Sequence, residues 1–305
     1  MAWYVLRRLS WMVLTLWIIF TVSFVLISIV PGGPFDSERQ MEPEVRANIE
    51  RKYHLDEPLP MRYLRTLDLT LHGDLGISSR LRDFTVNEVI AQGLPISGAL
   101  GALALAGAII VGLAAGIVSA VRRGTPLDFA MMTIATVGIA LPNFVIAGVM
   151  LLLFVFTIPL FPAAGWGSVR QLVLPAFCLG APYAAYIARL VRAGMLDVLG
   201  QDYIRTAVAK GLPGRTVIFR HALRGALLPL VSFLGPATAG ILTGSLVVEQ
   251  VFAIPGLGVH FVRAATQRDE TMAMGMVLLY STLLYLMNLL VDLAYALLDP
   301  RVKLE

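Results

Sequence analysis

The sequence predicts an all-α integral membrane protein with six transmembrane helices, and three observations support that fold class. Of the 305 residues, 57% are hydrophobic and only 14% are charged, against about 25% charged in a typical soluble domain. The apolar residues gather in six runs, each long enough for the roughly 20-residue helix that crosses a bilayer. The basic residues, which give a net charge of +4, lie between these runs, so they indicate membrane topology and not nucleic-acid binding.

The predicted spans are Leu9–Val30, Ile96–Val121, Met131–Leu160, Leu172–Val191, Ala226–Val248 and Met272–Leu298. The first follows Arg7 and Arg8, as the apolar part of a signal peptide would. However, its apolar core of about 22 residues is longer than a signal peptide needs, and Ile29-Val30-Pro31-Gly32 is no small-x-small cleavage site. An uncleaved first helix is therefore predicted.

The distribution of charge predicts that both termini lie in the cytoplasm. With the N-terminus inside, the cytoplasmic segments hold 13 basic and 5 acidic residues, and the external segments hold 11 basic and 14 acidic residues, with Asp292 inside the sixth span. An excess of basic residues in short cytoplasmic loops is the rule for membrane proteins.

The only long polar segment, residues 31–94, is predicted to form a small helical external cap between the first two spans. Val45, Ile49 and Tyr53 recur every four residues, which predicts a first amphipathic helix. Tyr63, Leu67 and Leu71 predict a second such helix; Pro58 and Pro60 separate the two, and Gly73-Asp74-Leu75-Gly76 marks a turn. The predicted organisation is a first helix at 1–30, the cap at 31–94, a five-helix core at 95–298 and a cytoplasmic tail at 299–305.

Glycines and prolines within the spans indicate how the helices pack. Gly112–Gly116 and Gly240–Gly244 each form a GxxxG pattern, which lets helix backbones approach closely. Packing within this chain is the favoured interpretation, over a dimer face. Prolines interrupt the third, fourth and fifth spans and are predicted to bend them; they are Pro142, Pro182 and Pro236.

No motif of an energy-consuming enzyme is visible in the chain. GxxxxGK[ST], HExxH and GxSxG are absent, the four histidines are scattered, and Cys178 is the single cysteine, so neither a metal site nor a disulfide is predicted. Asp292 and Arg189 lie near cytoplasmic helix ends. They are interpreted as structural intramembrane charges, with Arg189 or Arg192 as the partner of Asp292, and not as an ion-coupling site. The chain is predicted to supply a pathway and no ATPase activity.

The segment from Tyr203 to Pro229 is basic and amphipathic and lies between two apolar spans. Its cations would be expelled from lipid, so the segment is predicted to form a cytoplasmic surface. Those cations are Arg205, Lys210, Arg215, Arg220 and Arg224. On the residues alone, docking of a partner and adsorption to anionic lipid remain open alternatives.

Several stretches of this segment resemble the cytoplasmic loop of the peptide branch of ATP-binding-cassette (ABC) importers. They are Arg205-Thr206-Ala207, Ala209-Lys210-Gly211-Leu212-Pro213, Arg220-His221-Ala222-Leu223 and Leu227-Leu228-Pro229. Arg205 stands where most of that superfamily has glutamate, a departure that suits the peptide and nickel branch. Further resembling motifs cover nearly the whole chain in order: Arg7-Arg8, Pro31-Gly32, Lys52-Tyr53-His54-Leu55, the turn at Gly73, Glu249, Ile254-Pro255-Gly256-Leu257-Gly258, Arg268-Asp269 and Asp299-Pro300-Arg301.

The resemblance implies the type I ABC importer permease fold, with a coupling loop at 192–225. A short helix over Asp202–Lys210 would rest in a groove of an ATPase, with Ile204, Ala207 and Val208 on an apolar side and Arg205 and Lys210 on a basic side. Gly211 would allow a sharp turn after it, and Pro213 would stop the helix. The implied coupling residues are Ile204, Arg205, Thr206, Ala207, Ala209, Lys210, Gly211, Leu212, Pro213 and His221.

The resemblance also implies the assembly. The chain would be the permease subunit of an oligopeptide importer in a bacterial inner membrane, with a homologous second permease, two ATPase subunits that bind ATP and Mg²⁺, an external peptide-binding protein, peptide substrate and membrane lipid. It would bind no nucleic acid and no cofactor of its own, and its path-lining residues are not identified by the sequence. A dipeptide or nickel permease of the same family is the alternative. A secondary transporter, or a membrane-embedded hydrolase, is a more distant one.

Overall fold

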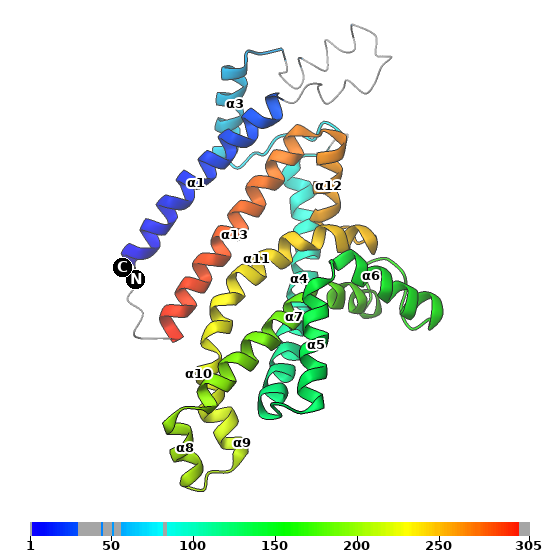
Figure 1. The fold of residues 1–305 in the computed structure, drawn as a ribbon. Helices are drawn as coiled ribbons and strands as arrows, with labels where there is room; N and C mark the ends of the chain where they lie inside the picture. Colours follow the sequence, from blue (N-terminus) through cyan, green and yellow to red (C-terminus); the bar gives the residue numbers. More distant parts are fainter. Residues whose placement is uncertain (1, 30–43, 45–50, 52–55, 82–83, 299–305) are drawn as a thin grey trace. The chain divides into compact units, whose positions relative to one another are not determined.

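The computed structural model describes residues 2–29, 44, 51, 56–81 and 84–298, and within them the regular structure is helical (Figure 1). An isolated bridge between Ile77 and Thr85 is the one β-type pairing there. The helices longer than one turn are α1 (Ala2–Ile29), α3 (Leu59–Leu71), α4 (Val86–Val121), α5 (Pro126–Ala140), α6 (Asn143–Leu151), α7 (Val169–Leu199), α8 (Asp202–Ala209), α11 (Leu228–Val251), α12 (Leu257–Gln267) and α13 (Glu270–Leu298).

Each predicted span has a helical counterpart, although not every counterpart is one helix. In the described part of the chain, α1, α4, α7 and α13 are each long and apolar enough to cross a membrane. Two bent pairs of helices raise the number of spans to six if each pair crosses once. Helix α4 begins at Val86, ten residues before the predicted start, and continues through Pro95. The last residues of the predicted cap therefore belong to the second span.

The predicted third span is not a single bent helix. It breaks at Pro142, where α5 and the continuation of α6 meet at 110°. Leu141 has an extended backbone (φ −84°, ψ 128°), which is the conformation that a following proline imposes. By contrast, helices α7 and α11 continue through Pro182 and Pro236. The fifth span begins with a 55° bend just before Leu228.

The chain divides into two compact units that differ from the predicted domains. The first comprises residues 1–97 and 255–285, so it unites α1 and the predicted cap with α12 and most of α13. Within it, Tyr63 of α3 contacts the rings of Phe20 and Phe24 on α1, at centroid separations of 5.5 and 5.4 Å. Tyr63 also shares a 2.9 Å hydrogen bond with Thr21. The second predicted cap helix therefore exists and packs on α1, whereas the first, at Val45, Ile49 and Tyr53, lies outside the described residues.

A buried carboxylate organises the other end of this unit. Asp269, just before α13, accepts a hydrogen bond from the Ser78 hydroxyl and others from the backbone amides of Ser79 and Met272, both at 3.2 Å. The predicted turn is present, since Gly73 and Gly76 have φ of +79° and +86°. The motifs at Gly73 and at Arg268-Asp269 thus serve turn formation and packing, respectively.

The second unit, residues 98–254 and 286–305, is built around α7. Helix α4 approaches α7 so closely at Gly112 and Gly116 that an added Cβ would lie 2.7 Å from the carbonyl oxygens of Ala184 and Ala188. The predicted function of this GxxxG, tight packing within the chain, is confirmed. At the second pattern, Gly240 faces the hydroxyl of Tyr183 on α7.

Candidate functional site

The residues from Gly200 to Leu227 form a compact helical elbow that follows the end of α7 (Figure 1). Gln201 has an extended backbone and starts α8, because its carbonyl accepts hydrogen bonds from the amides of Ile204 and Arg205 at 3.1 and 3.3 Å. The helix runs from Asp202 to Ala209, close to the predicted Asp202–Lys210. We refer to residues 200–227 as the elbow.

The end of α8 is fixed by a Schellman motif. The Gly211 amide donates to the Val208 carbonyl at 2.9 Å, and the Leu212 amide donates to the Ala207 carbonyl at 3.3 Å, the two bonds that define this motif. Gly211 has φ of +75°, the left-handed region that glycine adopts at little cost. The predicted sharp turn at Gly211 is confirmed. Pro213 then begins the one-turn helix α9 (Gly214–Thr216) instead of continuing α8.

One side of α8 is buried against the chain itself. Ile204 and Ala207 are 3% and 6% exposed and belong to an apolar cluster with Met195 of α7 and with Val217 and Ala222 further along the elbow. Burial of these side chains removes apolar surface from water and stabilises the elbow. The predicted apolar side was only partly right, because Val208 is 60% exposed. Only Ile204 and Ala207 belong to the inward stripe.

The opposite side of α8 carries Arg205, Thr206 and Ala209, all exposed. At about 100° per residue, Ala209 lies almost opposite the buried stripe. Arg205 contacts Asp202 at 3.5 Å, but both side chains are largely exposed, and such pairs contribute little to stability. The outer side of α8 is therefore a surface of small residues, with the exposed guanidinium group of Arg205 at its edge.

The return half of the elbow contains a π-helical turn, η2 (Val217–Ala222), followed by the short helix α10 (Leu223–Ala226). Turns of this type are frequent at functional sites. Phe219 is 55% exposed, while His221 is half-buried. With exposed Tyr203, Val208 and Leu212, Phe219 gives the elbow more apolar surface than a segment facing only water needs.

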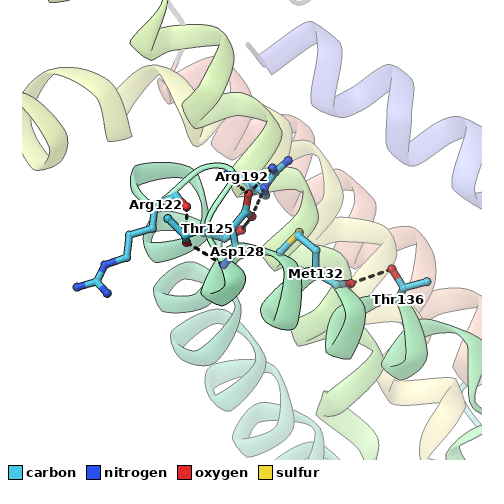
Figure 2. Close-up of polar contacts among 8 residues, drawn as sticks. Arg122, Thr125, Asp128, Met132, Thr136 and Arg192 are labelled. Atoms are coloured by element: carbon cyan, nitrogen blue, oxygen red, sulfur yellow. Dashed lines mark hydrogen bonds and ion pairs between the residues drawn. The ribbon is translucent and has the colours of Figure 1, made fainter.

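Sequence reasoning missed Asp128 as a site residue. Arg192 of α7 donates from Nε and Nη2 to the two carboxylate oxygens of Asp128, at 2.8 and 2.9 Å (Figure 2). The Ser119 hydroxyl and the Gly124 amide donate to the same carboxylate, whose side chain is only 7% exposed. This bidentate pair joins segments 64 residues apart in sequence.

A local signal for Asp128 was nevertheless present. Thr125-Pro126-Leu127-Asp128 matches the start of a helix, with a threonine cap, proline in the first position and an acid in the third. The structure places the start of α5 there, and the Asp128 amide approaches the Thr125 hydroxyl at 3.4 Å (Figure 2). The spacing predicts the helix start, but not the distant arginine.

The two predicted intramembrane charges, Asp292 and Arg189, are less defined. Arg189 is exposed and Asp292 is half-buried, and their pairing stays a prediction. Arg192, the second arginine considered for Asp292, binds Asp128 instead. Among the described residues, no cluster of three His, Cys, Asp or Glu side chains could hold a metal ion.

Comparisons with known proteins fit this architecture. Residues 112–304 match the family described as binding-protein-dependent transport system inner membrane component. The chain is 42% identical to the oligopeptide transport system permease protein OppB of Salmonella typhimurium over 302 residues, 98% of this chain and 99% of the relative. It is 45% identical to the dipeptide transport system permease protein DppB of Bacillus subtilis over 305 residues, 100% of this chain and 99% of the relative.

Among solved structures, a chain of the MetNI methionine ABC transporter in an inward-facing conformation is similar with a TM-score of 0.58. The match covers 69% of this chain and 96% of that chain. At 20% sequence identity the likeness establishes the fold, which is that of an ABC importer permease. The apolar helices, the permease fold and the near full-length relatives lead to one conclusion: the chain belongs to the family of inner membrane components of binding-protein-dependent transport systems.

Proposed function

We propose that this chain is the permease subunit of an ATP-driven oligopeptide importer in a bacterial inner membrane, with both termini in the cytoplasm. It forms the translocation path with a homologous second permease. Two ATPase subunits bind ATP and Mg²⁺, an external binding protein delivers the peptide, and this chain holds no cofactor. The near full-length identity to oligopeptide permeases supports the substrate class.

The observation that carries the proposal is the construction of the elbow. Helix α8 is buried on one side, fixed at its end by Gly211, and exposed on the side of Ala209. A groove of the ATPase accepts that exposed side. When ATP closes the ATPase pair, α8 is displaced and moves α7 through the packing of Ile204 and Ala207 against Met195. Transport is then a shift between two bundle conformations, driven by their different affinities for the closed ATPases.

Dipeptide import is a second candidate, because the identity to the Bacillus subtilis dipeptide permease is 45%. Uptake in a strain lacking its own peptide permeases, with the cognate subunits supplied, distinguishes the candidates. Competition by peptides of two to six residues and by Ni²⁺ reports the substrate class. Uptake of tetrapeptides and longer peptides supports the oligopeptide assignment; inhibition by dipeptides or Ni²⁺ alone contradicts it.

Ala209→Trp is expected to abolish association with the ATPases while the chain still inserts and binds the second permease. The indole would project from the exposed side of α8, where a close-fitting groove has no room for it. Co-purification of the ATPases with tagged permease measures the effect. Ala265→Trp, at an exposed alanine of helix α12 outside the elbow, is the matched control. Full recovery of the ATPases with Ala209→Trp would refute docking through this side.

The orientation is tested with cysteines in a Cys178→Ala background. His72→Cys, exposed after α3, is expected to react with a membrane-impermeant maleimide in cells with an intact inner membrane. Arg215→Cys, exposed in α9, is expected to react only after that membrane is opened. Labelling of Arg215→Cys in sealed cells would reverse the orientation.

A further inference from the structure

We infer that the Asp128–Arg192 pair is a positioning device that makes the α4–α5 loop (residues 122–125) move with the elbow, so that ATPase motion reaches α4 and α5 as well as α7. The inference rests on the proposed function. It concerns residues outside the elbow, however, and its test does not require a peptide substrate.

The end of α7 and the elbow are packed together as one unit. Val191 and Met195 are fully buried in the same apolar cluster as Ile204 and Ala207. Gly194 lies so close to α10 that an added Cβ would be 2.8 Å from the Ala226 carbonyl oxygen. Because well-packed interiors transmit displacement instead of absorbing it, motion of α8 carries the last turns of α7 with it.

Arg192 continues a row of contacts between α7 and α4. Ala184, Ala188 and Arg192 are spaced by four residues and therefore follow one side of α7. The first two face Gly112 and Gly116 of α4. At the next position, the Asp128 carboxylate links Arg192 to Ser119, the next α4 residue in the row. The polar pair thus continues the glycine-mediated contact toward the elbow.

The glycine contacts and the arginine–carboxylate pair constrain the helices differently. Glycine contacts hold two helices at a short distance, but smooth surfaces can slide or rotate. A bidentate arginine–carboxylate pair fixes direction as well as distance. Asp128 Oδ1 also accepts a bond from Ser119 at the end of α4, and Oδ2 accepts one from the amide of Gly124 in the loop, where φ is +76°. Helix α7 therefore cannot slide or rotate at Arg192 without moving the loop.

The experiment uses the whole transporter with its ATPases and a reporter cysteine, Arg123→Cys, at an exposed loop position, in the Cys178→Ala background. The rate of maleimide labelling is compared without nucleotide and with ATP plus orthovanadate. With Arg192 intact, we expect this rate to change when nucleotide is trapped. Adding Arg192→Gln is expected to abolish the change while ATPase co-purification and ATP hydrolysis persist.

Matched variants separate positioning from general stability. Arg122→Gln removes an exposed arginine of the same loop and is expected to retain the nucleotide-dependent change. Arg192→Lys keeps the positive charge but loses the bidentate geometry of the guanidinium group. This variant is expected to retain part of the nucleotide-dependent change. The double variant Asp128→Asn, Arg192→Gln is expected to show the same loss of the nucleotide-dependent change as Arg192→Gln alone. The reason is that each substitution removes the same interaction.

The outcomes distinguish this inference from the proposed function. An unchanged nucleotide response with Arg192→Gln, or loss of ATPase co-purification in that variant, overturns the positioning role. If the unsubstituted transporter fails to bind the ATPases, the coupling proposal fails instead. If it binds them and hydrolyses ATP but the loop cysteine shows no response to nucleotide, the inference fails and the coupling proposal stands. A loss of response that is specific to Arg192→Gln supports the inference, whichever peptides are carried.

Discussion

Gly211→Val is expected to leave the chain inserted in the membrane but to uncouple import from ATP hydrolysis. An added Cβ at Gly211 meets no atom within 4 Å, so the expected effect comes from the backbone, whose φ is +75°. A non-glycine residue in this conformation costs about 1–2 kcal/mol, and a β-branched residue is especially disfavoured there. A loss of that size lowers the equilibrium ratio of ordered to disordered α8 terminus by about 5–30-fold.

The measurement for Gly211→Val is peptide imported per ATP hydrolysed in proteoliposomes containing all subunits. Gly211→Asn is the matched control, since asparagine tolerates the left-handed region, and it should retain most of the coupling. Wild-type coupling by a well-assembled Gly211→Val transporter would show that the Schellman turn is dispensable for energy transfer.

Gly112→Ala is expected to produce a large loss of stability for the addition of a single methyl group. The added Cβ would lie 2.7 Å from both the Ala184 carbonyl oxygen and the Ile187 Cβ, and backbone atoms cannot move away unless the helices separate. Overpacking of this kind typically costs about 1–3 kcal/mol. The midpoint of thermal unfolding in detergent measures it.

Gly107→Ala provides the comparison for Gly112→Ala on the same helix. No atom lies within 4 Å of an added Cβ at Gly107, and alanine is a better helix former than glycine by about 1 kcal/mol. Its midpoint should be unchanged or higher. Equal midpoints for the two variants would mean that α4 and α7 are not in close backbone contact.

Sequence patterns predicted what local chemistry determines. Runs of apolar residues identified the spans, and glycines four residues apart indicated close helix packing within the chain, although not the partner helix. The turn at Gly211 was implied by the family resemblance and agrees with the tolerance of glycine for positive φ. Each of these features depends on intrinsic residue properties within a few turns of helix. The stretch from Ala209 to Pro213 was informative because its helix end needs a residue that accepts positive φ.

Long-range features could not be predicted in this way. The partner of Arg192 is chosen by how α5 and α7 pack, so Asp292 was an equally reasonable candidate from depth alone. The three prolines illustrate the same limit: each removes one backbone hydrogen bond, yet only Pro142 breaks its span, while α7 and α11 continue. Likewise, Ile204 is buried and Val208 is exposed because of where α7 and η2 lie against α8.

The break at Pro142 has a consequence for how this part of the chain is solvated. Helix α5 has 15 residues, about 22 Å at 1.5 Å per residue, so it is shorter than a hydrocarbon core of about 30 Å. Val145 and Ile146 donate to the Pro142 carbonyl, but the carbonyls that end α5 and the first amides of α6 have no partner in the next turn of their own helix. Acyl chains cannot supply hydrogen bonds, and irregular backbone exposed to lipid does not occur. The annulus of lipid around this chain must therefore be interrupted at Pro142, where water or another polypeptide supplies hydrogen bonds to the backbone.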